Sequence, residues 1–122
     1  MTLLLIAVAG AVGAPLRYVI DAWLDDRLDA AFPWGTFAVN LTGSFAFGLL
    51  VGLQHGGQLT TRAATIFGTG LCGAFTTFST HTLESLRLAE DGAWRLAAYN
   101  IVSTFVVCTV AAAAGFGVAA LA

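Results

Sequence analysis

Charged residues are scarce in this chain of 122 residues: only 10% are Asp, Glu, Lys or Arg, and lysine is absent altogether. A typical soluble domain carries about 25% charged residues. The five basic residues are all arginines, they are scattered, and the formal net charge is −2. A nucleic-acid-binding protein would instead cluster its basic residues on one face. The composition therefore argues against a soluble domain and against nucleic acid as a partner.

Cysteine is also rare, with only two residues, Cys72 and Cys108. Both lie in apolar stretches, where a lone cysteine usually packs as a small hydrophobic side chain. Two such residues predict neither a disulfide framework nor a metal site made of thiolates.

Long apolar stretches make up most of the chain, and 58% of the residues are hydrophobic. A membrane-spanning helix needs about 20 mostly apolar residues. The pattern predicts an all-α integral membrane protein, a single membrane domain over residues 1–122. Its approximate spans are 2–24, 32–53, 63–87 and 95–121. No basic residue precedes Arg17, so the first stretch is interpreted as a span rather than as a cleaved secretory signal peptide.

Glycine is common, with fourteen residues, most of them inside the predicted spans. Two pairs of small residues have a spacing of four: Gly48 with Gly52, and Ala111 with Gly115. Helices in lipid associate by close backbone approach over such pairs. We therefore expect both pairs to lie at close contacts between helices.

The third predicted span differs from the others in its composition. Within residues 68–82, three glycines precede five hydroxyl residues. Such clusters let a membrane helix break and satisfy its backbone in another way. A broken helix at membrane depth exposes backbone groups that can bind ions. The alternative is an unbroken helix whose hydroxyls bond back to its own carbonyls, and composition alone leaves both open.

Polar residues recur inside three of the spans. Thr36 and Asn40 lie four residues apart in the second span, Tyr99 and Ser103 have the same spacing in the fourth, and 76–81 is a polar run in the third. Polar groups are costly in a membrane and are often functional. They predict a track of uncharged hydrogen-bond donors, suited to a small anion. The alternative is hydrogen bonding between helices that serves packing alone.

Four segments together carry a resemblance to a known family. The second span contains residues 33–45, Pro-Trp-Gly-Thr-Phe-Ala-Val-Asn-Leu-Thr-Gly-Ser-Phe. The third contains residues 70–80, Gly-Leu-Cys-Gly-Ala-Phe-Thr-Thr-Phe-Ser-Thr, followed by Glu84. The matching residues of the first span are Gly10, Gly13 and Arg17. Those of the fourth span are Tyr99, Asn100 and Ser103. In order and spacing the whole chain resembles the Fluc/CrcB family of fluoride channels.

This resemblance implies a passive channel that exports cytoplasmic fluoride across the cell inner (plasma) membrane, confers fluoride resistance and is not an enzyme. It implies an antiparallel dual-topology dimer with two pores. Asn40 would donate to the ion, and Phe78 would turn its ring edge toward it. The implied fluoride pathway comprises Thr36, Asn40, Phe78, His81, Tyr99 and Ser103. The resemblance also implies a structural sodium ion (Na+) at the dimer interface, held by backbone carbonyls of Gly73 and Thr76.

Two charged residues are assigned to a vestibule or to an interface. The resemblance places Arg17 near a vestibule or helix end and Glu84 near the pore mouth. For both, an interface salt bridge is an equal alternative, as is a side chain that extends to the membrane surface.

His81 departs from the family pattern, which has a second phenylalanine at this position. A neutral imidazole can still donate a hydrogen bond, and a protonated one would attract anions. His81 is therefore expected either to tune selectivity or pH response, or to mark a subunit with one impaired pore. For the chain as a whole, the alternative is a non-conducting subunit of a heterodimeric fluoride channel.

The arginines bear on the partner subunit, because arginine bias sets membrane orientation. Four arginines lie nearer the side opposite the termini, namely Arg17, Arg27, Arg87 and Arg95. The fifth, Arg62, lies nearer the termini. The predicted partners are thus fluoride, the lipid bilayer and a second subunit, either a copy of this chain or an oppositely oriented paralogue. A small multidrug-type exporter and a non-transporting scaffold are the other classes, and the first span lacks a central acidic residue that such an exporter needs.

Overall fold

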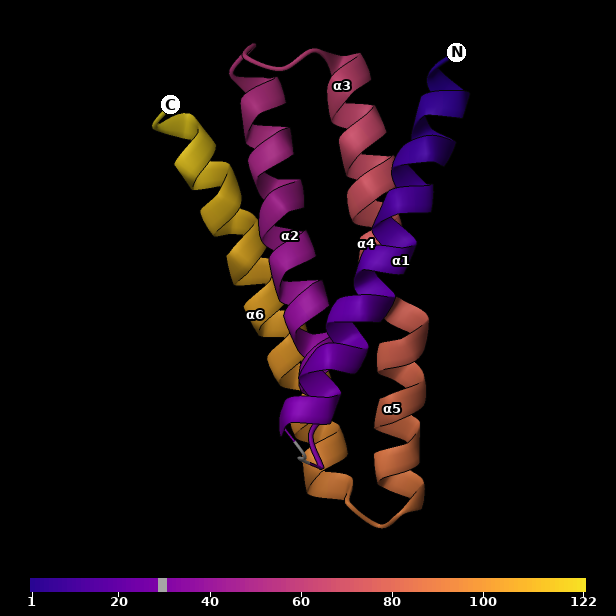
Figure 1. The fold of residues 1–122 in the computed structure, drawn as a ribbon. Helices are drawn as coiled ribbons and strands as arrows, with labels where there is room; N and C mark the ends of the chain where they lie inside the picture. The colour runs from indigo at the N-terminus through magenta and orange to yellow at the C-terminus, as the bar shows by residue number, and fades with distance from the viewer. Residues whose placement is uncertain (29–30) are drawn as a thin grey trace.

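The structure is a computed structural model that describes residues 1–28 and 31–122. Every regular element in these residues is helical (Figure 1). The segment 66–72 is a π-helix. In chain order the elements are α1 (Thr2–Leu28), α2 (Trp34–His55), α3 (Thr61–Thr65), η1 (Ile66–Cys72), α4 (Gly73–Phe75), α5 (Phe78–Glu90) and α6 (Trp94–Ala120).

The described residues form four antiparallel segments, as predicted. Helices α1, α2 and α6 are each long and apolar enough to cross a membrane. The remaining segment consists of α3, η1, α4 and α5, and its interruption leaves no part long enough to qualify alone. Both termini and the α2–α3 connection lie at one end of the molecule, and the end of α1, the start of α2 and the α5–α6 turn lie at the opposite end (Figure 1). The expectation of an all-α, four-helix membrane fold is confirmed.

Helices α2 and α6 lie side by side and pack through the small residues that the sequence singled out (Figure 1). A Cβ atom added at Gly48 would collide with the backbone carbonyl of Ala112. One added at Gly115 would collide with the carbonyl of Phe45 on the opposite helix. Because backbone cannot yield as a flexible side chain can, these glycines set the closeness of the two helices.

The glycine-rich half of the third segment packs against α1. A Cβ atom at Gly13 would lie 2.5 Å from the Leu71 carbonyl oxygen, and one at Gly70 would lie 2.7 Å from the Ile6 carbonyl oxygen. The backbone here is wound as a π-helix, a form that is rare and frequently found at functional sites. The sequence predicted the close approach of this segment but not its π-helical winding.

The third segment breaks at two extended residues, Thr76 and Thr77, near its middle. Thr76 has φ −77° and ψ 158°, and Thr77 has φ −145° and ψ 122°. The Thr77 hydroxyl accepts a hydrogen bond of 3.2 Å from the Thr80 backbone N–H and so caps the start of α5. The predicted break is confirmed. Beside the break, one hydroxyl also bonds back to a carbonyl of its own helix: the Thr76 hydroxyl donates to the Cys72 carbonyl oxygen at 3.0 Å.

Candidate ion pathway around the helix break

The Asn40 side chain joins α2 to the break. Its Nδ2 donates to the Thr77 carbonyl oxygen at 2.9 Å, and its Oδ1 accepts from the Thr77 backbone N–H at 2.7 Å. Only 7% of the Asn40 surface is exposed. The amide thus supplies the partner that the Thr77 N–H lacks at the break, because buried backbone groups must be paired. It also adds a second bond to the Thr77 carbonyl, which as the N-cap carbonyl accepts the first bond of α5. One hydrogen of Nδ2 remains for another acceptor.

A hollow of about 570 Å³ lies beside this amide, between α2, the break, α5 and α6. We call it the central hollow. Its wall offers amide, hydroxyl and imidazole groups among apolar side chains, and none of its lining residues is acidic or an arginine. They are Asn40, Ser44, Thr76, Thr77, Phe78, His81, Ile101, Thr104, Phe105, Cys108, Thr109 and Ala112.

Phe78 is the first residue of α5 and lies on the rim of the central hollow. Its side chain is 82% exposed, although it is large and apolar. An exposed ring in this position is available to a neighbouring molecule and to an ion in the hollow. An aromatic ring is electropositive at its edge, so it can face an anion.

His81 belongs to a buried polar cluster between α5 and α6. Asn100 Nδ2 lies 3.0 Å from Ser85 Oγ, to which it donates, and 3.4 Å from His81 Nδ1. Ser85 Oγ donates to the His81 carbonyl at 2.8 Å, and the Thr104 hydroxyl donates to Asn100 Oδ1 at 3.4 Å. Asn100 is only 1% exposed. The cluster therefore holds the His81 ring at the wall of the central hollow.

Thr36 lies in a separate polar site, together with two carboxylates. Its hydroxyl is 2.7 Å from Glu84 Oε1 and 3.3 Å from Asp21 Oδ1. A hydroxyl has a single hydrogen, so the shorter contact with Glu84 is the stronger hydrogen bond. Nearby, Asp25 Oδ1 accepts from the Gly35 backbone N–H at 3.1 Å.

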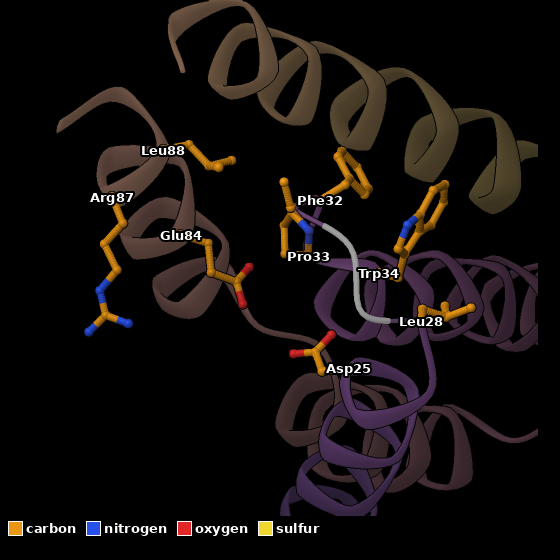
Figure 2. Close-up of a pocket in the computed structure, with 9 residues that line it drawn as sticks. Asp25, Leu28, Phe32, Pro33, Trp34, Glu84, Arg87 and Leu88 are labelled. Atoms are coloured by element: carbon orange, nitrogen blue, oxygen red, sulfur yellow. The ribbon is translucent and has the colours of Figure 1, made fainter. Parts of the chain in front are cut away.

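Two of these carboxylates, Asp25 and Glu84, border a second hollow, of about 310 Å³, at the end opposite the termini. Figure 2 shows the carboxylates of Asp25 and Glu84 directed into the same space, while the Arg87 guanidinium points away from Asp25. Phe32, Pro33 and Trp34 form its apolar side. The predicted vestibule position of Glu84 thus coincides with a polar hollow.

The expected pathway residues do not form one continuous line in the single chain. Asn40, Phe78 and His81 meet at the central hollow, and Thr36 lies with Glu84. Tyr99 is 60% exposed, with its ring centroid 5.6 Å from that of Phe32. Ser103 Oγ is buried without a hydrogen-bond partner among the described residues and does not line the central hollow.

The groups assigned to sodium lie at the two ends of α4, because Gly73 is its first residue and Thr76 follows its last. Gly73 is exposed and Thr76 is half-buried. The Thr77 N–H, which would bond the Gly73 carbonyl in an unbroken helix, donates to Asn40 instead. Freed carbonyl oxygens are the kind of ligand that a hard cation takes. In residues 1–28 and 31–122, no group of His, Cys, Asp and Glu side chains is arranged to hold a metal. Arg17 is half-buried on α1.

Several polar residues of these sites were not assigned a role from the sequence. They include Asp21, Asp25, Ser85, Asn100 and Thr104. Asn100 and Thr104 carried a usable signal, because a polar group inside an apolar span usually has a partner. Asp21 and Ser85 carried none, because their partners lie on other helices at sequence distances that no local pattern reveals.

The comparisons with known proteins agree on one family. The family described as "CrcB-like protein, Camphor Resistance (CrcB)" has a model that matches residues 4–116. "Fluoride-specific ion channel FluC 1" of Streptomyces avermitilis is 50% identical over 112 residues, which cover 91% of this chain and 90% of the relative.

Two further relatives extend the match to nearly the whole chain. "Fluoride-specific ion channel FluC 1" of Frankia casuarinae is 44% identical over 124 residues, covering 98% of this chain and 96% of the relative. "Fluoride-specific ion channel FluC" of Magnetococcus marinus is 44% identical over 117 residues, covering 95% of each chain. With these matches and its apolar helices, the chain is a multi-pass membrane protein that belongs to the CrcB-like family.

Proposed function

We propose that this chain is a subunit of a fluoride channel that lets the anion leave the cytoplasm passively. Three relatives that match nearly its whole length are named fluoride-specific ion channels. The observation in the structure that carries the proposal is the central hollow, where uncharged donors from α2, the break, α5 and α6 meet at one place.

The chemistry of the central hollow suits a small anion. An ion that enters a membrane loses water and needs donors that replace it, yet it must still be released. Asn40 retains one amide hydrogen, and the Ser44 hydroxyl lies on the same wall. Because no arginine or carboxylate lines this hollow, it neither traps an anion with a full charge nor repels it.

The driving force for export is the membrane potential. A charge that crosses gains roughly 2.3 kcal/mol per 100 mV, and a potential that is negative inside drives anions outward. No covalent bond is made or broken, so the proposed activity is transport across the cell inner membrane rather than catalysis. Its consequence for the cell is resistance to fluoride.

The proposed channel contains a second subunit. Phe78 and Tyr99 are large aromatic residues that the single chain leaves 82% and 60% exposed, and both are expected in the pathway. An antiparallel partner that covers Phe78 would close the open side of the central hollow. The partner is either a second copy or an oppositely oriented paralogue. The excess of arginines at the end opposite the termini favours one membrane orientation of this chain, so both kinds of partner need to be tested.

A structural sodium ion is part of the proposal. The Asn40–Thr77 bonds leave the Gly73 carbonyl without its helical donor, on a surface that the single chain exposes. A cation shared by Gly73 and Thr76 carbonyls of two subunits would satisfy such groups at the interface. Sodium would supply charge balance for backbone oxygens there and takes no part in conduction.

Fluoride efflux from liposomes tests the function. We expect the purified chain, alone or with an oppositely oriented paralogue, to release trapped potassium fluoride when valinomycin carries the balancing potassium, as followed with a fluoride electrode. Phe78→Ile should reduce the rate strongly. Phe67→Ile is the matched control, because Phe67 is also exposed but lines neither hollow.

The outcomes separate the alternatives. Efflux from the chain alone supports the homodimer, and efflux only with the paralogue supports the heterodimer. If neither preparation releases fluoride, although both are folded and inserted in both orientations, the proposed function is wrong.

A further inference from the structure

His81 lies where two hollows of the chain meet. Besides the central hollow, a hollow of about 470 Å³ runs along α5 and α6 toward Ala89 and Trp94, near the turn between these helices. We call it the outer hollow. Phe78, His81 and Ile101 line both. An ion that moves between the outer hollow and the break therefore passes these three side chains, of which His81 alone carries a polar group.

The hydrogen bonds around His81 fix which of its nitrogens carries the proton. Ser85 has one hydroxyl hydrogen and donates it to the His81 carbonyl at 2.8 Å. Its oxygen can then only accept, so the atom of Asn100 that lies 3.0 Å away is the amide nitrogen. The Thr104 hydroxyl, 3.4 Å from Asn100 Oδ1, donates to the opposite side of the same amide and agrees with this orientation.

With the amide oriented in this way, His81 Nδ1 faces a donor. Asn100 Nδ2 has a second hydrogen, and His81 Nδ1 lies 3.4 Å from this nitrogen. A ring nitrogen that faces an N–H must be an acceptor, so the proton of the ring is on Nε2. An imidazolium would place two donors against each other at this contact. Asn100 therefore favours one neutral tautomer over the charged ring.

The free Nε2–H is the part of the ring that an ion can reach. Nε2 makes no hydrogen bond with the described residues, and it is not fully enclosed by protein as Ser103 Oγ and Glu84 Oε2 are. We propose that Asn100 and Ser85 hold His81 as an uncharged Nε2–H donor at the junction of the two hollows, where it selects fluoride over larger halides. This inference rests on the proposed channel function.

Selection follows from the kind of donor. A neutral N–H binds an anion through a hydrogen bond, which is strongest with the smallest and most basic halide. A fixed positive charge would hold any anion strongly and slow its release, which works against conduction. His81 thus acts as a specificity-determining residue, and Asn100 is a positioning residue that acts through it.

Nuclear magnetic resonance tests the tautomer without any transport. The experiment uses the full chain in micelles with ¹⁵N-labelled histidine and His55→Gln, which leaves His81 as the sole histidine. We expect the imidazole nitrogens at neutral pH to show the Nε2–H neutral pattern. In Asn100→Asp the new acceptor should move the proton to Nδ1 or protonate the ring fully. An Nδ1–H tautomer or an imidazolium in the parent chain would overturn the inference.

Efflux measurements test the role of the donor. His81→Gln keeps an uncharged N–H, and we expect its fluoride rate to stay within about threefold of the parent. His81→Leu removes the donor but keeps a side chain of similar size, and loss of a hydrogen bond to a charged partner predicts at least about a tenfold lower fluoride rate. The chloride rate should change less, so the selectivity ratio should fall.

The two proposals fail in different ways. If the parent chain conducts fluoride but His81→Leu conducts it equally well and with the same selectivity, the inference on His81 is wrong and the channel function stands. If the parent chain does not conduct under any condition, the channel function fails and the donor role fails with it, whatever tautomer the spectrum shows.

Discussion

Asn40→Asp is the substitution that tests the helix break most directly, because it changes one donor into an acceptor with almost no change in shape. In the structure the Asn40 amide donates to the Thr77 carbonyl at 2.9 Å and accepts from the Thr77 N–H at 2.7 Å. An ionised carboxylate keeps the second bond and places an oxygen against the Thr77 carbonyl oxygen.

The magnitude follows from the burial of this contact. Loss of this hydrogen bond costs about 1 kcal/mol, while the Thr77 carbonyl keeps the first intrahelical bond of α5. We therefore expect the free energy of unfolding to fall by at least about 1 kcal/mol, before the cost of burying a charge against the carbonyl oxygen is added. Protonation of the new carboxyl restores a donor toward Thr77, so the loss should be smaller at acidic pH than at neutral pH.

The assay is denaturant titration in micelles at fixed protein concentration, since dimerisation would otherwise shift the midpoint. Thr42→Val is the matched control, because Thr42 is an exposed residue of α2 whose hydroxyl bonds the Ala38 carbonyl of its own helix at 2.7 Å. Its effect should stay within about 0.5 kcal/mol. A loss for Asn40→Asp as small as for this control would refute the claim that the amide holds the break.

Three further substitutions test the packing and the caps. Gly48→Ala should lower the thermal midpoint, with a cost of about 1–3 kcal/mol from overpacking, whereas Gly117→Ala, where a Cβ atom meets open space, should have no adverse effect. Thr36→Val should cost about 1–3 kcal/mol in denaturant titration, and a double-mutant cycle with Glu84→Ala, which removes the acceptor, should show coupling; additive effects would contradict the 2.7 Å bond. Thr77→Ala removes the cap of α5 and should cost about 1 kcal/mol, with faster amide hydrogen exchange in the first turn; unchanged exchange would contradict the capping role.

Much of the fold could be predicted because its causes are local in the sequence. Apolar stretches of membrane length predicted the helices, and the spacing of Gly48 with Gly52 and of Ala111 with Gly115 predicted close contacts. The hydroxyl cluster after the glycines predicted the break. The π-helix over residues 66–72 could not be predicted, because its backbone is set by contact with α1, which composition does not describe.

The site was predicted in part, and the difference is again physical. Asn40, Phe78 and His81 stand in a recognisable sequence pattern and meet at the central hollow. The bond between Thr36 and Glu84 joins residues 48 positions apart, and no periodicity within one helix can reveal such a pair. Polar groups inside apolar spans could be flagged one by one, but their partners could be assigned only from the arrangement of the helices.

One amide connects the fold of this chain to its proposed function. Because Asn40 bonds to both backbone groups of Thr77, the third segment can break at membrane depth without leaving a buried N–H unpaired. The same bonds remove the helical donor of the Gly73 carbonyl and place the free amide hydrogen of Asn40 beside the central hollow. The residue that stabilises the break therefore lies on another helix, α2. A variant that keeps the hollow but loses this amide should lose the conformation of the break, and its loss of conduction should follow from that change rather than from weaker ion binding alone.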